Sequence, residues 1–137
     1  MHDIAPEIVS IADACLGGLR GRSALLIGSE EGRAPYVQLL GQAHMQCIYE
    51  EETPERLSSL LPNIQLLISV PDRYQSVPTI TAANIARGSM GRHTPLLIFD
   101  LAIPASVEEL AGLLPAVCLY TSNDLRSILA RKEMKAS

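Results

Sequence analysis

Residues 24–34, with the sequence ALLIGSEEGRA, place a glycine where many nucleotide-binding proteins begin a phosphate-binding loop. The dinucleotide fingerprint Gly-x-Gly-x-x-Gly uses its first glycine for a tight turn and its second for close approach of the backbone to the pyrophosphate. Its third glycine lets the helix pack closely on the strand. Counted from the first glycine, the three positions hold Gly28, Glu30 and Arg33. The loop therefore keeps the turn but lacks the other two glycines.

The charges of this loop oppose phosphate binding. Glu30 and Glu31 put two carboxylates where phosphates would lie, and two unit charges 4 Å apart repel by about 1 kcal/mol in water and about 4 kcal/mol at an effective dielectric constant near 20. The helix N-terminus offsets this with only about half a positive charge. Arg33 could add a cation if its side chain curls back, and Gly32 restores some backbone freedom. The candidate cofactor-binding residues of the loop are Gly28, Ser29, Glu30, Gly32 and Arg33.

The end of the second apolar run bears on the choice of cofactor. An acid about 20 residues beyond the first glycine is suited to the ribose hydroxyls of NAD, and Glu50 or Glu51 fits that description. Three successive carboxylates, Glu50 to Glu52, would meet the 2′-phosphate of NADPH, so Glu51 and Glu52 disfavour this cofactor. The alternative is that these acids form the solvated start of a helix, where the helix dipole favours them. The sequence leaves open whether NADH, NADPH or no dinucleotide binds.

Two further candidates end other apolar runs. Ser69 closes the third run, although Val70 and Pro71 replace the small residues that close contact with a cofactor would need. Asp100 closes the fourth run and could face a ligand, although a lone carboxylate there more often orders a loop. The segment 87–93, RGSMGRH, has the glycine and basic content of an anion-binding nest. Because it follows a helix, we interpret it as a helix-to-strand connection.

The sequence predicts neither a metal site nor a catalytic constellation. Cys15, Cys47 and Cys118 are far apart and have apolar neighbours, so we expect buried free thiols. The three histidines show no ligand spacing. No set of general acid, base and nucleophile can be assembled.

The bulk composition favours a single globular domain over residues 1–137. Eleven basic and fifteen acidic residues give a net charge of −4, which argues against a nucleic-acid partner. Apolar runs are too short to span a membrane, and the N-terminus has no signal-peptide pattern. We expect a cytoplasmic protein.

Apolar runs alternate with helical patterns along the chain. We expect strands near residues 24–27, 45–49, 66–70, 96–100 and 117–120. We expect helices over residues 4–15, 34–40, 53–61, 79–88, 107–114 and 122–135, the fifth of them begun by a capping box of Ser106 and Glu109. This alternation predicts a doubly wound, three-layer α/β domain with a five-stranded parallel sheet in the Rossmann-like order 3-2-1-4-5. A small-molecule ligand would bind at the carboxyl ends of the strands.

Three stretches carry a resemblance to a known family. They are residues 8–32, the run 66–70 (LLISV), and PLLIFDLAIP at 95–104 followed by LYTSNDL at 119–125. Together they resemble the central NADPH-binding domain of glutamyl-tRNA reductase, which starts tetrapyrrole synthesis from glutamate. The resemblance implies an Asn-Arg-Thr turn after the second strand, where this chain has glutamates. The family's amino-terminal domain with its catalytic cysteine and its carboxyl-terminal dimerisation helices have no counterpart here, so no cysteine is assigned as that nucleophile and the chain is not a complete reductase by itself.

These observations leave three functions open. The chain is an NAD(P)H-binding module that works with a separate catalytic domain, or a degenerate, non-catalytic Rossmann domain that acts as a scaffold or partner in tetrapyrrole biosynthesis. The third option is a different small-ligand site at the strand ends, built from Ser29, Arg33, Asp100 and Tyr120. We also expect a homodimer or a complex with another protein, through an apolar patch on the helix Ile4–Leu16 or on Leu125–Leu129.

Overall fold

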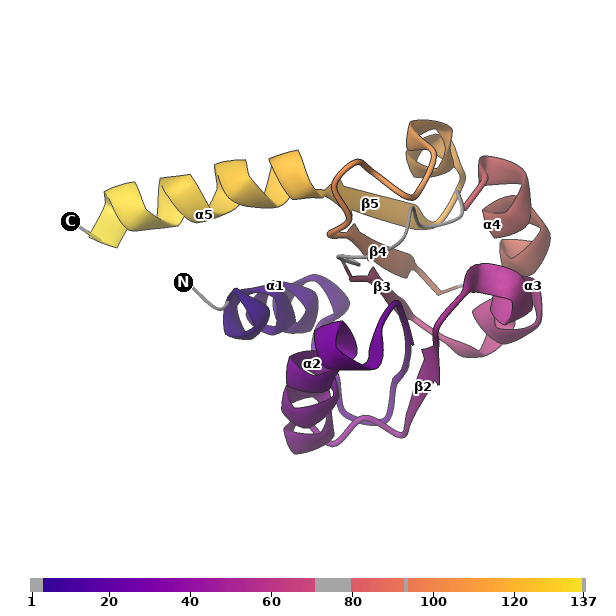
Figure 1. Ribbon diagram of the computed structural model, residues 1–137, viewed down its shortest axis with the longest axis horizontal. Coiled ribbons are helices and arrows are strands. Elements are labelled where there is room, and N and C mark those ends of the chain that lie inside the picture. Colours follow the sequence, from indigo (N-terminus) through magenta and orange to yellow (C-terminus); the bar gives the residue numbers. More distant parts are fainter. Residues whose placement is uncertain (1–3, 71–79, 93, 137) are drawn as a thin grey trace.

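The computed structural model describes residues 4–70, 80–92 and 94–136 (Figure 1). Its centre is a five-stranded sheet in which every neighbouring pair of strands is parallel. The strands are β1 (Ser23–Ile27), β2 (Cys47–Glu51), β3 (Leu66–Ser69), β4 (Leu96–Asp100) and β5 (Val117–Thr121). The predicted α/β class and the predicted strand positions are confirmed, with shifts of no more than two residues at the ends.

The strand order differs from the prediction. The observed order is β2-β1-β3-β4-β5, so the order 3-2-1-4-5 is wrong. Every residue of β3 is buried, whereas β2 is mostly half-buried and ends in two glutamates. A strand that is buried on both faces belongs inside a parallel sheet, and a polar strand is better placed at its edge. The chain therefore reverses direction across the sheet between β1 and β3.

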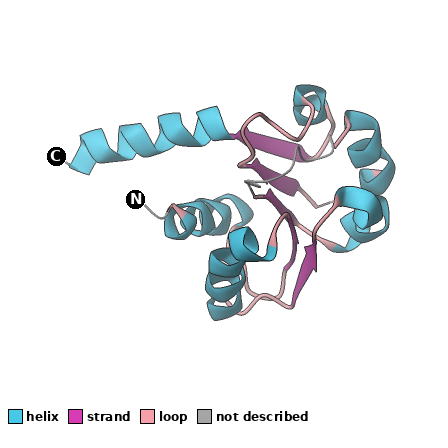
Figure 2. Cartoon of the chain, in the orientation of Figure 1, coloured by secondary structure: helices cyan, strands magenta, loops and turns pink. Residues whose placement is uncertain are grey.

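Helices cover both faces of the sheet (Figure 2). One face carries α1 (Ala5–Leu16) and α2 (Glu30–Gln42), and the core on this side includes Ile8, Tyr36 and Phe99. On the other face lie α3 (Leu57–Leu60) with its flanking 3₁₀ turns η1 (Pro54–Arg56) and η2 (Leu61–Asn63), α4 (Ala82–Ser89) and the 3₁₀ turn η3 (Glu109–Leu113). The last helix, α5 (Ser122–Ala136), extends away from the sheet (Figure 1).

Four helix predictions need correction. The helix expected at 53–61 is α3 with its two 3₁₀ turns, and the one expected at 79–88 begins at Ala82, where Thr81 caps it. The helix expected at 34–40 begins earlier, at Glu30, because the Ser29 hydroxyl accepts the Gly32 N–H and caps it. Pro35 therefore lies in the second turn. The helix expected at 107–114 is only the short turn η3, because Ser106 is buried and hydrogen-bonds to Asp100 instead of capping a helix.

The thiol prediction is also wrong. Cys15 and Cys118 are exposed and Cys47 is half-buried. Cys47 and Cys118 lie on β2 and β5, the two edge strands, whose apolar neighbours along the chain do not ensure burial. Within the described ranges, no helix combines the length and the apolar character needed to cross a membrane.

Candidate functional site

The β1–α2 loop lies at the carboxyl ends of the strands and consists of Gly28 and Ser29. The Gly28 N–H donates to the Glu51 carbonyl at 3.0 Å, which ties the loop to β2. The Ser29 hydroxyl accepts the Gly32 N–H at 3.2 Å. Glu30 and Glu31 follow as exposed residues in the first turn of α2. One of the helix amides available to a phosphate is thus already bonded within the chain, and two carboxylates stand beside the rest.

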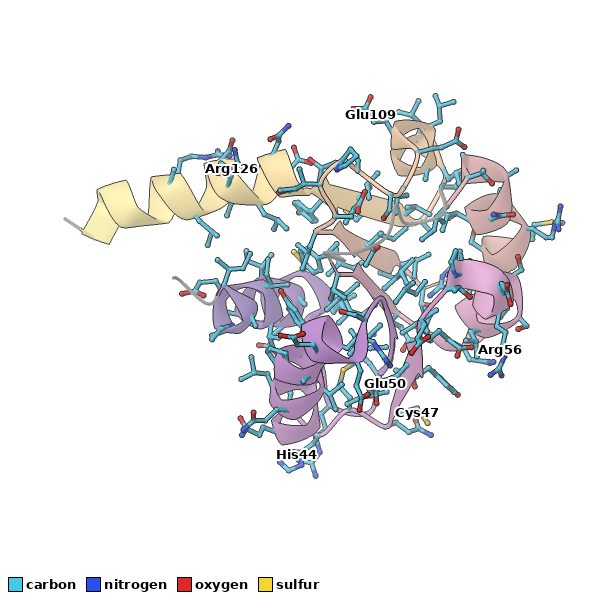
Figure 3. The ribbon with its side chains drawn as sticks, in the orientation of Figure 1. His44, Cys47, Glu50, Arg56, Glu109 and Arg126 are labelled. Carbon is cyan, nitrogen blue, oxygen red and sulfur yellow. The ribbon has the colours of Figure 1, made fainter. Side chains whose placement is uncertain are left out.

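Arg33, at the third fingerprint position, forms an ion pair with Glu50, one of the two acids expected to bind the ribose hydroxyls of NAD. Its side chain is only 9% exposed, and its Nη1 lies 3.1 Å from Oε1 of Glu50. Its Nε donates to the Ser29 carbonyl at 3.2 Å. Glu50 projects from β2 on the face of the sheet that carries α1 and α2 (Figure 3). The pair therefore bridges the loop, α2 and β2 at the carboxyl ends of these two strands.

Position 28 requires a glycine, because the residue that follows β3 leaves no room for a side chain there. Its φ is +139°, and a Cβ at this position would lie 2.3 Å from Cγ2 of Val70. Val70 is fully buried, and its N–H donates to the Ile27 carbonyl at 2.9 Å, which extends the β1–β3 pairing. In open α/β sheets a ligand binds where the strand order reverses, which here is between β1 and β3. At that point the Val70 side chain packs directly against Gly28.

The two glutamates of β2, Glu50 and Glu51, do not face the same side of the sheet. Glu50 pairs in register with Leu26 and Glu51 with Ile27, so their side chains point to opposite faces of the sheet. Glu51 forms an ion pair with Arg56 at 3.2 Å, and its Oε1 accepts no hydrogen bond from any described residue. The expectation that three successive carboxylates meet one phosphate is therefore wrong, because β2 continues through Glu51 and alternates its side chains.

Ser69 and Asp100 belong to a buried polar network on the face that carries α3 and α4. Both are at most 1% exposed. Asp100 accepts the Ser106 hydroxyl at 2.8 Å and the N–H groups of Ser106 and Val107, both at 2.9 Å. Because the Ser106 hydrogen goes to a carboxylate, Ser69 donates to Ser106 at 2.8 Å. Asp100 thus orders the loop after β4, one of the two roles considered from sequence.

Tyr120 lies on the opposite face from Asp100. Its ring stacks on Phe99 with 5.5 Å between centroids, and its hydroxyl is 3.8 Å from Sγ of Cys15. The hydrogen bond with Cys15, followed by burial, raises the pKa of Tyr120 above its usual value. The four residues proposed for a different ligand are therefore divided between the two faces of the sheet.

Residues 87–89 of the segment 87–93 form the end of α4, and only residues 90–92 lie between this helix and the loop to β4. The Arg92 guanidinium donates to the carbonyls of Leu61 at 2.9 Å and Ile64 at 2.7 Å, and burial lowers its pKa. These bonds satisfy one carbonyl at the start of η2 and one directly after its end. His93 and Pro71 lie outside the described residues. In the part of the chain that is described, no three His, Cys, Asp or Glu side chains are placed to hold a metal ion.

The structure divides the eight predicted cofactor-binding residues into two groups. Six of them gather around the β1–α2 loop: Gly28, Ser29, Glu30, Gly32, Arg33 and Glu50. Ser69 and Asp100 lie on neighbouring strands but are engaged with Ser106. Sequence reasoning missed the role of Ser106, because its spacing to Glu109 also matched a capping box. The sequence showed that Val70 replaces a small residue, but not that its side chain packs against Gly28.

The chain is similar in sequence to glutamyl-tRNA reductases. No family model matches the chain. The chain is 29% identical to glutamyl-tRNA reductase of Methanospirillum hungatei over an alignment that covers 91% of this chain and 35% of that enzyme. It is also 29% identical to the glutamyl-tRNA reductase of Idiomarina loihiensis, over 93% of this chain and 34% of the enzyme. The chain spans about a third of the length of these curated relatives.

Solved structures show the same fold. Glutamyl-tRNA reductase from Methanopyrus kandleri superposes with a TM-score of 0.79 at 21% sequence identity, over 98% of this chain and 38% of that protein. A dipicolinate synthase chain from Bacillus halodurans superposes with a TM-score of 0.64 at 12% identity, over 93% of this chain and 52% of the other. The resemblance to glutamyl-tRNA reductase is confirmed, as is the Rossmann-like α/β fold.

Proposed function

We propose that the chain is a glutamyl-tRNA reductase-like Rossmann domain linked to tetrapyrrole (heme) biosynthesis, with weakened or lost dinucleotide binding and a non-catalytic role as scaffold or partner. The link to this pathway comes from the relatives, whose similarity covers nine-tenths of the chain. The relatives are about three times longer, so their reaction is not transferred to this chain. A cytoplasmic location remains a prediction.

The observation that carries the proposal is that Arg33 and Val70, both beside the β1–α2 loop, are already engaged within the chain. Arg33 and Glu50 form an ion pair at 3.1 Å, and Val70 packs on Gly28. A dinucleotide would have to separate a largely buried arginine from its partner and displace a buried valine. Each of these steps costs free energy that binding must recover.

The second candidate is an NAD(P)H-binding module that works with a separate catalytic domain. The turn at Gly28 favours it, because a glycine with a positive φ still leads from β1 to the N-terminus of α2. Under this candidate, NADH is preferred to NADPH, since Glu50 lies at the end of β2 and Glu52 is exposed just beyond it.

Calorimetric titration of the purified chain with NADPH, NADH and a tetrapyrrole tests both candidates. We expect no useful NADPH affinity in the parent, and any residual binding should favour NADH. The double substitution Glu30→Gly with Arg33→Gly should produce measurable NADH binding, because it removes the carboxylate at the point of backbone approach and opens the ion pair. Adding Glu52→Arg should shift preference toward NADPH, since arginine pairs well with a phosphate.

A matched control replaces an exposed acid and an exposed arginine outside the loop, Glu109→Gly with Arg131→Gly, and should leave dinucleotide binding unchanged. Circular dichroism verifies that each variant is folded. NADH binding by the parent in the micromolar range would support the second candidate. Micromolar NADPH binding with clearly weaker NADH binding would contradict our account of the loop.

A further inference from the structure

An apolar groove lies beside the first turns of α5, separate from the β1–α2 loop. It has a volume of about 370 Å³, and its apolar lining comes from the N-cap of α1, the loop after β4 and the first half of α5: Ile4, Leu101, Ile103, Leu125 and Leu129. Leu125 is buried, but Ile103 is 72% exposed and Ile4 is 38% exposed. Large aliphatic side chains at such a groove are typical of a surface that another molecule covers.

Helix α5 reaches past this groove. Only its beginning packs on the domain, where Leu125 is buried and Ile128 contacts the core. The rest continues outward beyond the sheet, on the side where both chain ends lie (Figure 1). At 1.5 Å per residue, its fifteen residues are about 22 Å long. Neighbours within the same chain thus support only part of this helix.

The surfaces around the groove carry opposite charges. Arg126 and Arg131 of α5 are exposed, and its last seven residues, ARKEMKA, include two lysines and one glutamate. On α1, Glu7 and Asp13 are exposed. Among the described residues no ion pair joins α5 to α1. One chain therefore carries a helix with a net positive charge, α5, and a helix with a net negative charge, α1.

We propose that two copies of this chain form a dimer about a two-fold axis, in which α5 of each copy lies along α1 and the apolar groove of the other. A two-fold interface must be self-complementary, because each contact occurs twice with the copies exchanged. This chain carries both complementary parts, a projecting basic helix and an apolar groove beside an acidic helix. The proposal is independent of dinucleotide binding.

Apolar substitutions test the location of the interface by sedimentation velocity over a range of protein concentrations. Ile103→Asp should weaken dimerisation at least tenfold, because it places a charge in the groove. Leu113→Asp is the matched control, since Leu113 is a similarly exposed aliphatic residue on η3 and should leave the dissociation constant unchanged. Loss of the dimer through Leu113→Asp but not Ile103→Asp would overturn the proposed interface.

Charge reversal tests the pairing of helices. Variant one carries Glu7→Lys and Asp13→Lys, and variant two carries Arg126→Glu and Arg131→Glu. Each variant alone should associate at least tenfold more weakly than the parent, because like charges then face each other. An equal mixture of the two should form heterodimers, since each basic α5 then meets an acidic α1 and each acidic α5 meets a basic α1.

The recovery in the mixture excludes misfolding as the cause of weak association in each variant alone. A parent chain that stays monomeric at millimolar concentration would overturn the proposal, as would a dimer that neither variant weakens. A parent that is monomeric alone but binds a different protein through Ile103 would show that a partner, not a second copy, covers the groove, and would also overturn it.

Discussion

Asp100 orders the loop after β4 as a buried carboxylate with four hydrogen bonds. Both of its oxygens are used, since Oδ1 accepts from Ala102 and the Ser106 hydroxyl, and Oδ2 accepts the amides of Ser106 and Val107. We expect Asp100→Asn to lower the free energy of unfolding by about 1–3 kcal/mol, because an NH₂ group cannot accept from the backbone amides that it would face. Urea denaturation measures the change.

The control for this prediction is Asp13→Asn, because Asp13 is exposed on α1. It should change the free energy of unfolding by less than about 0.5 kcal/mol. Equal stability of the Asp100→Asn variant and the parent would show that the network contributes little to the fold.

The Tyr120 hydroxyl provides a prediction about ionisation. Its pKa is raised mainly by the hydrogen bond with Cys15, so Cys15→Ala should lower it toward the ordinary value of about 10. NMR of the tyrosine ring carbons during a pH titration measures this. Because folding favours the protonated tyrosine, its contribution to stability is complete below pH about 10 and is lost as pH rises through the folded-state pKa.

Cys47→Ala provides a reciprocal control. Tyr49 has a raised pKa for which Cys47 is the leading cause. The Cys47→Ala variant should therefore lower the pKa of Tyr49 and leave that of Tyr120 unchanged. A Tyr120 pKa that does not respond to Cys15→Ala would mean that the thiol and the phenol do not interact in solution.

At the residue scale, the sequence could predict the types of group in the loop but not their partners. The spacing placed Arg33 at the third fingerprint position, yet its pairing with Glu50 depends on β2 lying beside β1. Such a contact joins residues that are 17 positions apart. The spacing of Ser106 and Glu109 is typical of a helix cap. In the structure the Ser106 hydroxyl instead donates to the buried carboxylate of Asp100, six residues earlier.

At the element scale, α3, η2 and α4 pack closely because of Gly88. A Cβ on Gly88 would lie 2.5 Å from Cδ1 and 2.6 Å from Cβ of Leu61. We expect Gly88→Ala to destabilise the protein by about 1–3 kcal/mol, since the helix must move away from a buried leucine. Thermal or urea denaturation gives the size of the loss.

Gly41 offers the matched substitution in another helix. It lies in α2, and no atom of the described residues outside the helix's own backbone lies within 4 Å of an added Cβ. Gly41→Ala should therefore stabilise the protein by about 0.5–1 kcal/mol, the ordinary gain in helix propensity. If both alanine variants changed stability in the same direction, the close contact between Gly88 and Leu61 would not be the cause.

Element positions were predictable where one physical signal dominated. The strands are short apolar runs bounded by turn residues, and Gly17 ends α1 in the left-handed conformation with a φ of 68°. The predicted start of α2, at residue 34, is too late. Pro35 is a residue type that favours the first turn of a helix, but Ser29 supplies an earlier cap and the helix begins at Glu30. Two local signals competed there, and hydrogen bonding to the backbone decided the outcome.

At the scale of the whole molecule, strand order was the feature that local pattern could not determine. Order depends on which strand each crossover connection returns to, and all parallel sheets of this kind use the same right-handed crossovers. Burial would have helped, because β3 is apolar at three of its four positions whereas β2 contains two glutamates. A strand with this many charges is poorly suited to a position between two others.

The observed order leads to a prediction about hydrogen exchange. The three central strands, β1, β3 and β4, are buried at every position, while β2 and β5 form the edges and are mostly half-buried. Amides of central strands exchange only when most of the sheet opens, whereas an edge strand can separate alone at lower free energy. We expect the amides of β3 to exchange as slowly as those of β1 and β4, and those of β2 to exchange faster. In the order 3-2-1-4-5, β3 would be an edge and β2 would lie inside, so slower exchange in β2 than in β3 would favour that arrangement over the one described.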